Sequence, residues 1–469
     1  MNVPVLVVYV GDVQVGMLFK YAPENVPPVQ RFVVNEDYAS QAFALAPVLS
    51  ESMRAASAEQ QRSFWLDITA RRFNGEQDAK GQWLLPAFFQ NLLPEGIFRR
   101  HVAEEAQIVA SDFFALLAAC GKDLPGNVRT VWQALDRQAL ARLVTQNNDA
   151  LEMTVAAEPF QAAISISGVQ PKLGVNRTED GRFVGRTHLG DTSIIAKLPA
   201  PDYPRMPEVE AVSMALARAA GIHTCEFSLE PMHLLQAPHR YDLGEEAQGN
   251  FFAVQRFDRS PHGRIHMEDF AQVLGVQPDM KYTQSYLAVA ATLIDLAGCG
   301  ESSVLELIRR IAFNDLIGNA DMHLKNIALL YQDGRNASLS PAYDVVAQAL
   351  YHPVKGHALH LFDETVPHHA PQDPIWSPAR LRHFCSALDM PEKPAQAQIR
   401  GVVRKTLEQA PEIVLGSGMT PKQKRDLLVR IHRHAHAQAS MRRHPDMKAR
   451  WVDTMALADT LLPAPAVRA

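Results

Sequence analysis

Asp321 and Asn326 occur with the spacing D-x-x-x-x-N in the segment GNADMHLKN, residues 318–326, and Asp344 follows in the segment LSPAYDV, residues 339–345. Phosphoryl transfer needs one carboxylate that orients or deprotonates the attacking hydroxyl. It also needs an amide oxygen and a second carboxylate that hold Mg²⁺ on the phosphates. We therefore interpret Asp321 as a candidate catalytic base, and Asn326 and Asp344 as candidate magnesium ligands. The competing interpretation is a helix cap and turn residues, since Asp and Asn are common in both.

The segments around this loop predict how it meets the later carboxylate. The apolar positions before the loop have helical spacing, and the predicted helix ends at Gly318. Residues 327–331 are typical of a strand, Asp333-Gly334 of a hairpin turn, and residues 337–340 of the returning strand. The apolar helix positions are Val304, Leu307, Ile308, Ile311 and Leu316. The hairpin should bring Asp344 back beside the loop.

Lys197 lies in the predicted strand of residues 193–198, on a face where strand residues are usually apolar. A lysine in that place can neutralise nucleotide phosphates when a helix glutamate holds it. Glu210, on the predicted helix of residues 207–220, is the candidate partner, and Glu208 is its competitor. The alternative is an edge-strand lysine whose ammonium group reaches out to water.

The segment SISGVQPK, residues 165–172, lies upstream of Lys197. A hydroxyl-rich loop with one glycine can bring backbone N–H groups to phosphate oxygens. The segment lacks the G-x-G-x-x-G pattern, so an ordinary surface turn is the alternative. We interpret it as a candidate phosphate-binding loop.

The chain of 469 residues is long enough for two or three domains. A strand pair at its start, residues 5–10 and 13–20 around Gly11-Asp12, opens a small mixed α/β unit. The predicted parts are an N-terminal α/β domain (1–135), a connecting segment (136–160), a β-rich nucleotide-binding lobe (161–258), an α-rich catalytic lobe (259–450) and a C-terminal tail (451–469). The predicted fold class is therefore α+β: a small N-terminal domain followed by a two-lobed, protein-kinase-like domain.

Composition excludes several other classes. Hydrophobic residues make up 47% and charged residues 21%, which are globular values, and the net charge of −5 gives no reason to expect direct nucleic-acid binding. No apolar run approaches the length of a membrane span. The four cysteines match no zinc or disulfide spacing and are expected to be buried free thiols: Cys120, Cys225, Cys299 and Cys385. The sequence thus predicts a soluble, cytoplasmic protein without membrane contact.

His432, His434 and His436 alternate within the basic stretch of residues 422–443. On one continuous helix, His432 and His436 would share a face and could bind a metal. No carboxylate or cysteine lies nearby in register, so we interpret the stretch as a solvated helix face.

Eight segments resemble the HipA family, the serine/threonine kinase toxins of type II toxin–antitoxin modules. They are VGML (15–18), FFQNLLPEG (88–96), ISISGVQPKL (164–173), IIAKLP (194–199), VQRFDR (254–259), HMEDFAQVLG (266–275), GNADMHLKN (318–326) and LSPAYDV (339–345). Their order and spacing agree with that family from about residue 5 to residue 440.

The resemblance implies a role for each matching position. Asp321 falls on the catalytic aspartate, Asn326 and Asp344 on the magnesium ligands, and Lys197 on the phosphate lysine. The implied nucleotide contacts are Ser167, Gly168, Val169, Gln170, Pro171 and Lys172 in the phosphate loop, Gln255, Arg256 and Phe257 in the adenine hinge, and His323, Leu324, Lys325, Asn326, Tyr343 and Asp344. Ser165 falls on the serine that family members autophosphorylate to turn themselves off, and Ser167 is a second candidate.

The resemblance also implies ATP and Mg²⁺ as cofactors and a cytosolic protein substrate, often an aminoacyl-tRNA synthetase. It implies a small DNA-binding antitoxin of the HipB type, through which DNA would be contacted only indirectly. Ala320 stands where eukaryotic-type kinases carry an arginine, which fits the HipA pattern, while Gln255 replaces the glutamate of some members. Two other functions stay open: a small-molecule or phosphatidylinositol-like kinase, and an inactive co-repressor partner of the antitoxin.

Overall fold

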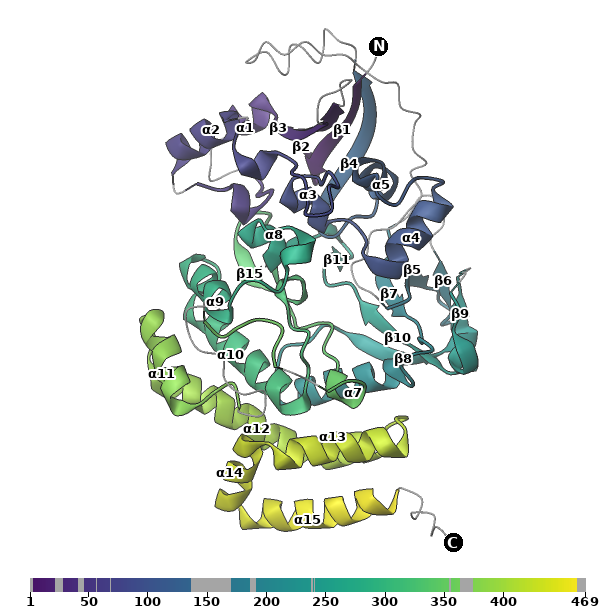
Figure 1. The fold of residues 1–469 in the computed structure, drawn as a ribbon, viewed down its shortest axis with the longest axis vertical. Helices are drawn as coiled ribbons and strands as arrows, with labels where there is room; N and C mark the ends of the chain where they lie inside the picture. Colours follow the sequence, from purple (N-terminus) through teal and green to yellow (C-terminus); the bar gives the residue numbers. More distant parts are fainter. Residues whose placement is uncertain are drawn as a thin grey trace.

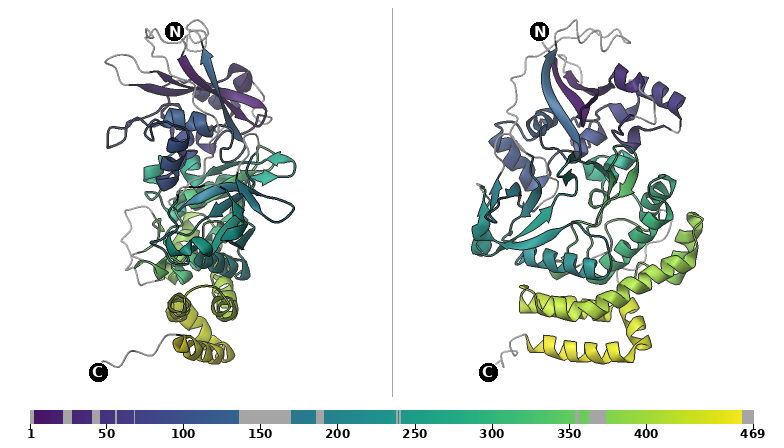
Figure 2. Two further views of the ribbon diagram at one scale, coloured as in Figure 1. Left: turned by 90° about the vertical axis from the view of Figure 1, so that its right-hand side faces the viewer. Right: turned by 180° about the vertical axis from the view of Figure 1, so that it is seen from behind.

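The chain folds into an N-terminal domain, a β-rich lobe and an α-rich lobe (Figure 1). The computed structural model describes residues 3–21, 28–40, 46–55, 57–67, 69–135, 170–185, 191–237, 239, 241–353, 356–362 and 374–461. The N-terminal sheet lies at one end of the molecule, and the last helices lie at the other (Figures 1 and 2).

A four-stranded antiparallel sheet, in the order β3-β2-β1-β4, forms the base of the N-terminal domain. Its strands are β1 (Val3–Val10), β2 (Val13–Tyr21), β3 (Val29–Val34) and β4 (Val128–Leu135). The helices are α1 (Glu36–Ser40), α2 (Ala58–Leu66), α3 (Ala87–Asn91), α4 (Gly96–Glu105) and α5 (Phe113–Cys120). The hairpin predicted at the start of the chain is confirmed, because β1 pairs with β2 across the turn at Gly11.

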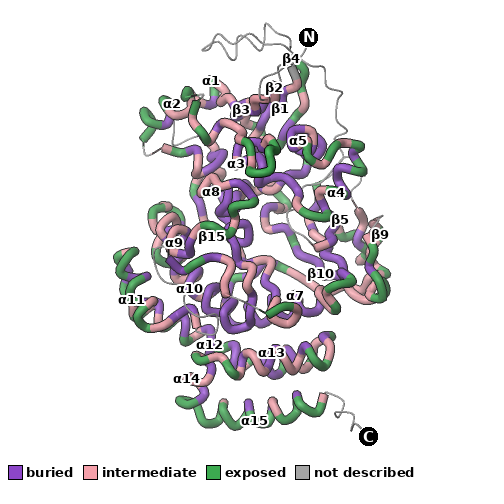
Figure 3. Tube along the Cα trace, in the orientation of Figure 1, coloured by how far each residue is buried: buried purple, intermediate pink, exposed green. Residues whose placement is uncertain are grey.

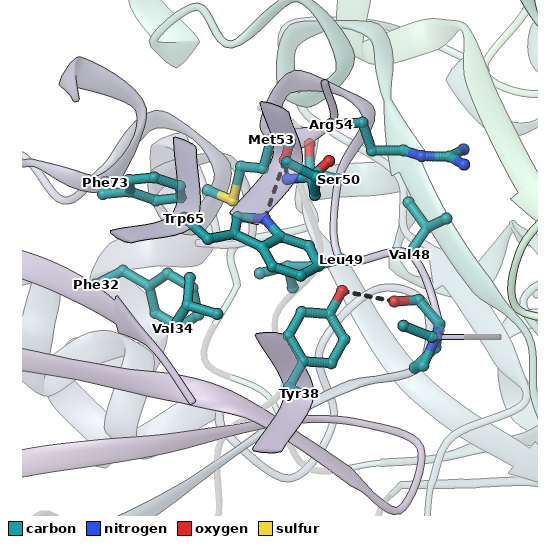
Figure 4. A pocket seen from close by; sticks show the side chains of 13 residues that line it. Phe32, Val34, Tyr38, Val48, Leu49, Ser50, Met53, Arg54, Trp65 and Phe73 are labelled. Carbon is teal, nitrogen blue, oxygen red and sulfur yellow. Dashed lines mark hydrogen bonds between the residues drawn. The ribbon is translucent and has the colours of Figure 1, made fainter. Parts of the chain in front are cut away.

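The segment of residues 46–55 joins this domain to the rest of the molecule. Where it faces the N-terminal domain, this segment lines a small apolar pocket (Figure 4). There the Tyr38 hydroxyl donates to the Pro47 carbonyl at 2.7 Å, and Trp65 Nε1 donates to the Met53 carbonyl at 3.2 Å. From the same segment, Ser50 Oγ donates a hydrogen bond to Glu268 Oε2 at 2.7 Å, on the strand of residues 266–269. The N-terminal domain is therefore fastened to the lobe that carries the candidate site.

The β-rich lobe is a six-stranded sheet in the order β8-β10-β7-β5-β6-β9, with the helix α7 (Met206–Ala219) beside β8 and β10. Its strands are β5 (Lys172–Arg177), β6 (Phe183–Gly185), β7 (Ile194–Lys197), β8 (Phe227–Pro231), β9 (Leu235–Gln236) and β10 (Asn250–Gln255). The predicted strand of residues 193–198 and the predicted helix of residues 207–220 are confirmed as β7 and α7. Residues 164–169 lie outside the described residues.

Short strands lead into the α-rich lobe: β11 (Arg259–Ser260) pairs with β12 (Gly263–Arg264), and β13 (His266–Asp269) pairs with β14 (Ala328–Tyr331), which pairs with β15 (Ala337–Leu339). The helices are α8 (Phe270–Leu274), α9 (Tyr286–Asp295), α10 (Gly300–Ile317), α11 (Pro378–Ala387), α12 (Glu392–Leu415), α13 (Pro421–Arg433), α14 (Ala435–Arg443) and α15 (Pro445–Thr460). Buried residues concentrate along α10 and α7, whereas α11 and α15 carry many exposed ones (Figure 3).

Two predictions about the end of the chain are wrong. Residues 451–460 are not a tail, because they belong to α15, whose Trp451 is fully buried and donates through Nε1 to the Leu407 carbonyl at 3.0 Å. Figure 2 shows α15 running beside α13. The basic stretch 422–443 is not one helix either, since His434 has extended backbone angles and separates α13 from α14.

The His434 ring, at the break between α13 and α14, contacts a residue of a distant helix. Its Nε2 lies 3.1 Å from Oδ2 of Asp315, a buried carboxylate on α10, and His357 Nε2 lies 3.2 Å from the other oxygen. No carboxylate of the sequence lies near these histidines in register, but Asp315 of α10 provides one in the folded chain. His436 Nε2 lies 2.8 Å from the Trp376 carbonyl, and the His432 ring stacks on Trp451.

The four cysteines are free and buried, as predicted. Among the helices of the described residues, none combines the length and the apolar character needed to cross a bilayer.

Candidate active site

Lys197 is held between the two lobes by carboxylates from both sides. Its Nζ lies 2.5 Å from Glu210 Oε1 on α7, and it also contacts Oδ1 of Asp344, which follows β15. The side chains of Lys197 and Glu210 are 10% and 0% exposed. Burial raises the pKa of Glu210 to about 7, although Lys197 opposes that rise. The partner of Lys197 is therefore Glu210, and Glu208 instead accepts a hydrogen bond from Asn250 Nδ2 at 2.9 Å.

The loop of residues 318–326 begins where α10 ends. Gly318 closes the helix with a φ of +77°, and a side chain at that position would also strike the Arg430 guanidinium. Within the loop, the Asp321 backbone N–H donates to Asn319 Oδ1 at 3.0 Å, and Asn326 Nδ2 donates to the Asp321 carbonyl at 2.7 Å. These bonds fix Asp321 and Asn326 relative to each other without using the Asp321 carboxylate.

Asp344 is carried back toward the loop by the predicted hairpin. Its backbone is left-handed, with a φ of +56°, and its carboxylate lines a cavity of about 10 Å³ together with Asn326. Burial alone would raise the pKa of Asp344, but Lys197 and Lys172 hold it well below its usual range. Asp344 is therefore an ionised carboxylate that lines the same small cavity as Asn326. Carboxylate and amide oxygens are the ligands that a hard cation accepts.

Tyr282 approaches Asp321 from the segment before α9, and the sequence did not predict it as a site residue. Its hydroxyl donates to Asp321 Oδ1 at 2.9 Å, and its ring lies edge-on to His323 with centroids 5.1 Å apart. Burial and the charge of Asp344 raise the pKa of Asp321. Burial lowers the pKa of His323 to about 4, so its imidazole is neutral at physiological pH. Asp321 is thus the titratable base of this loop that remains partly accessible.

Two further predicted contacts, Gln170 and Lys172, lie at the start of β5, an inner strand of the β-rich lobe. Lys172 pairs in register with Lys197 across β5 and β7, and burial with the charge of Lys197 lowers the Lys172 pKa to about 8. Gln170 Nε2 donates to the Leu198 carbonyl at 3.0 Å, and the Pro171 carbonyl accepts from the Leu198 N–H at 2.8 Å. The remaining phosphate-loop residues and Ser165 lie outside the described residues: Ser167, Gly168 and Val169.

Of the predicted hinge residues, Gln255 has an exposed side chain, whereas the side chains of Arg256 and Phe257 contact other residues of the protein. Gln255 is exposed and donates its backbone N–H to the Glu226 carbonyl at 2.8 Å, while Phe257 packs against Tyr343 with centroids 5.2 Å apart. The Arg256 side chain is not free for a nucleotide. It is buried and paired with Asp123 at 2.8 Å.

Leu324 and Lys325 also require correction as side-chain nucleotide contacts. Leu324 is fully buried in the core of the α-rich lobe. Lys325 Nζ donates to Asp269 Oδ2 at 2.8 Å and to two oxygens of Asn91, and its own carbonyl accepts from the Tyr343 hydroxyl at 2.7 Å. The helical geometry of the loop turns these two side chains inward, away from Asp321. Residues 324 and 325 could therefore contact a nucleotide only through their backbone atoms.

Comparison with known proteins identifies the family. The model of the HipA-like C-terminal domain matches residues 164–411, and the model of the HipA N-terminal domain matches residues 6–131. The chain belongs to the HipA family. The predicted resemblance is thereby confirmed over most of the chain.

Three curated proteins are similar to part of this chain. Y4dM, a presumed kinase of Sinorhizobium fredii, is 37% identical over 270 residues, which cover 57% of this chain and 63% of Y4dM. Y4mE, another presumed kinase of that organism, is 28% identical and covered over 64% of its length, so both matches span less than two thirds of the relative. The serine/threonine-protein kinase toxin HipA of Shewanella oneidensis is 22% identical over 70% of this chain and 77% of its own length.

The fold as a whole matches a solved HipA structure. A chain from the Shewanella oneidensis complex of HipA, HipB and operator DNA aligns with a TM-score of 0.62 at 18% identity, covering 93% of this chain and 99% of that chain. This likeness confirms the predicted fold class, an N-terminal α/β domain followed by a β-rich and an α-rich lobe.

Proposed function

We propose that this HipA-family chain is a serine/threonine protein kinase that transfers the γ-phosphate of ATP to a hydroxyl group of a cytosolic protein. The observation that carries the proposal is the contact of Lys197 with both Glu210 and Asp344. A lysine from the β-rich lobe, steadied by a helix glutamate and placed beside a metal-binding carboxylate, is the arrangement that phosphoryl transfer requires.

The residues around Lys197 are suited to ATP and Mg²⁺. Asn326 uses its Nδ2 on the Asp321 carbonyl, which leaves Oδ1 as an acceptor, and Asp344 offers the carboxylate oxygen that Lys197 does not contact. Two oxygen ligands together with phosphate oxygens suit Mg²⁺, which would neutralise charge on the transferring phosphoryl group. Lys172 and Lys197 would balance the negative charge of the phosphates.

Asp321 would act on the substrate hydroxyl. Its carboxylate would accept the proton while the hydroxyl oxygen attacks the γ-phosphorus, and the bond from that phosphorus to the β–γ bridging oxygen would break. The products are a phosphorylated protein and ADP, with the proton on Asp321. Tyr282 orients the carboxylate through its hydrogen bond to Oδ1.

The biological setting in this proposal follows the HipA relatives. One is named a serine/threonine-protein kinase toxin, and the solved neighbour is a complex with HipB and operator DNA. We propose that this chain is a growth-inhibiting toxin of the cytoplasm, bound by a HipB-like antitoxin that alone contacts DNA. A translation protein such as an aminoacyl-tRNA synthetase is the proposed target.

The growth effect and the target are tested together in cells. Brief induction of the wild-type chain, compared with Asp321→Asn, should slow growth and add phosphate to a small set of cytosolic proteins. Co-expression of the antitoxin should reverse both effects. Label that accumulates on a lipid or metabolite would indicate a small-molecule kinase instead, and the absence of both growth arrest and phosphorylation would indicate an inactive partner of the antitoxin.

Removing a magnesium ligand should raise the metal requirement. Asn326→Ala and Asp344→Ala each remove one oxygen ligand from a cation that tolerates incomplete octahedral geometry poorly, so each variant should need about tenfold more Mg²⁺ for half-maximal activity. Magnesium titrations of phosphoryl transfer measure this, with Asp333→Asn, in the exposed turn between β14 and β15, as the control. Unchanged titrations in both variants would show that the metal is held elsewhere.

Ser165, or otherwise Ser167, should be an inactivating phosphorylation site. A phosphate adds about −1.5 to −2 charge beside the nucleotide phosphates, so the modified loop should be stable only outside the ATP site. Mass spectrometry of the purified protein should find phosphate within residues 164–172, and the phosphorylated fraction should not bind ATP. Ser165→Ala should bind ATP normally. Equal ATP affinity of the two fractions would contradict this switch.

A further inference from the structure

Lys325 connects the candidate active site to the N-terminal domain. A lysine has three N–H donors, and all three of this ammonium group have partners: Asn91 O at 2.9 Å, Asn91 Oδ1 at 3.1 Å and Asp269 Oδ2 at 2.8 Å. Asn91 ends α3 of the N-terminal domain. Asp269 also accepts a hydrogen bond from the Gln272 N–H at 2.9 Å and thereby caps α8. Lys325 is therefore bound to α3 through Asn91 and to the start of α8 through Asp269.

Glu95, at the start of α4, makes a second connection. Its Oε2 lies 3.0 Å from Lys281 Nζ, and its Oε1 lies 3.7 Å from Lys325 Nζ and has no hydrogen-bond partner among the described residues. Burial alone would raise the pKa of Glu95, but Lys325 and Lys281 lower it to about 2. Glu95 is therefore ionised throughout the physiological range and holds two lysines by charge.

Both lysines lie close in sequence to groups that position Asp321: Lys325 belongs to the same loop, and Lys281 precedes Tyr282. The Lys281 carbonyl accepts from the Leu324 N–H at 3.3 Å, within the 318–326 loop. The next residue, Tyr282, donates its hydroxyl to Asp321 at 2.9 Å. A carboxylate of the N-terminal domain thus fixes both the segment that orients Asp321 and the loop that carries it.

We infer that Asn91 and Glu95 are positioning residues of the active site, so that the N-terminal domain completes the catalytic machinery within the same chain. They act through Lys325 and Lys281 and contact neither Asp321 nor Asp344 directly. The assignment of a catalytic effect rests on the proposed function, whereas the fixing of the loop does not.

Other contacts between the N-terminal domain and the α-rich lobe do not involve the loop, so they distinguish positioning of the loop from general attachment of the domain. Arg72 Nη1 donates to the Leu274 carbonyl at 2.8 Å, and Gln272 Nε2 donates to the Phe88 carbonyl at 3.2 Å. Both bonds cross the same domain boundary without touching the 318–326 loop. A variant of Arg72 should therefore weaken attachment but leave the loop in place.

The test compares Glu95→Gln with two controls in the full chain. Glu104→Gln makes the same chemical change at an exposed position of the same helix α4, and Arg72→Ala removes a boundary contact remote from the loop. Hydrogen exchange of peptides that contain residues 318–326 should become about tenfold faster in Glu95→Gln and should not change in either control. Unchanged protection of the loop in Glu95→Gln would overturn the inference.

Kinetics of phosphoryl transfer provide the second measurement. In Glu95→Gln, kcat should fall about tenfold or more, and this fall should exceed any rise in KM for ATP, because a misplaced base acts chiefly on the transition state. Lys281→Met should lower kcat similarly, and the double variant should be no worse than either single one. A raised KM with unchanged kcat, or additive losses, would contradict positioning. If the wild type transfers no phosphate, the proposed function fails, and the exchange result alone decides this inference.

Discussion

Replacing Asp321 with asparagine should lower the rate of phosphoryl transfer by about 10²–10⁴-fold, while the fold and ATP affinity stay close to those of the wild type. The amide cannot accept the substrate proton. The loop should keep its shape, because Asn326 bonds to the Asp321 backbone carbonyl and Tyr282 needs only the Oδ1 acceptor, which asparagine retains.

Steady-state kinetics, ATP titration and thermal unfolding of the same preparations check this expectation. Asp279→Asn, at an exposed position shortly before Tyr282, is the matched control and should behave as the wild type. Near wild-type turnover in Asp321→Asn would remove the carboxylate from its catalytic role. A large loss of ATP affinity would indicate that the substitution acts on nucleotide binding instead.

Lys197→Met should have the second large effect, on both activity and stability. It removes the cation that we propose to face the phosphates, and it leaves the buried Glu210 carboxylate without its partner. Breaking a buried ion pair by deleting one member costs about 3–5 kcal/mol of folding free energy. Transfer of phosphate should fall below detection, and chemical denaturation should show the lower stability.

A second substitution separates the two effects of Lys197→Met. Adding Glu210→Gln removes the stranded charge, so the double variant should regain most of the lost stability but none of the activity. Lys172→Met is the contrasting control for stability, because Lys172 has no ion pair among the described residues and lies beside the like charge of Lys197. Equal loss of stability in Lys197→Met with and without Glu210→Gln would show that the unpaired Glu210 carboxylate is not the cause of the loss.

The sequence predicted those parts of the site that depend on local pattern. Period-two alternation placed Lys197 on a strand, the helical spacing of apolar residues located the end of α10, and the Asp333-Gly334 turn predicted the hairpin that returns Asp344. Each of these features depends on residues close together in the chain. Their local signals were therefore sufficient.

Contacts between distant segments were not predictable in this way. Glu95 lies in the motif FFQNLLPEG, which was recognised as a family segment but gave no sign that its glutamate reaches Lys281 and Lys325. Tyr282 carries no motif of its own. His434, at the break between α13 and α14, contacts Asp315, a residue of α10 that no local window contains.

The same limitation explains the two loop residues that required correction. Family position suggested that Leu324 and Lys325 contact the nucleotide, but position in a motif does not reveal which way a side chain points. Leu324 packs in the core of the α-rich lobe, and the Lys325 ammonium group donates hydrogen bonds to Asn91 and Asp269. Residue type and spacing placed the loop at the end of α10, as the structure has it, and packing decided the use of each side chain.

Transfer of label from γ-labelled ATP tests the central claim most directly. The wild-type chain, incubated with Mg²⁺ and a cytosolic extract, should place the label on serine or threonine hydroxyls of protein, and the Asp321→Asn chain should leave the same extract unlabelled. An extract that stays unlabelled with the wild-type chain, or that is labelled equally by both chains, would contradict the account.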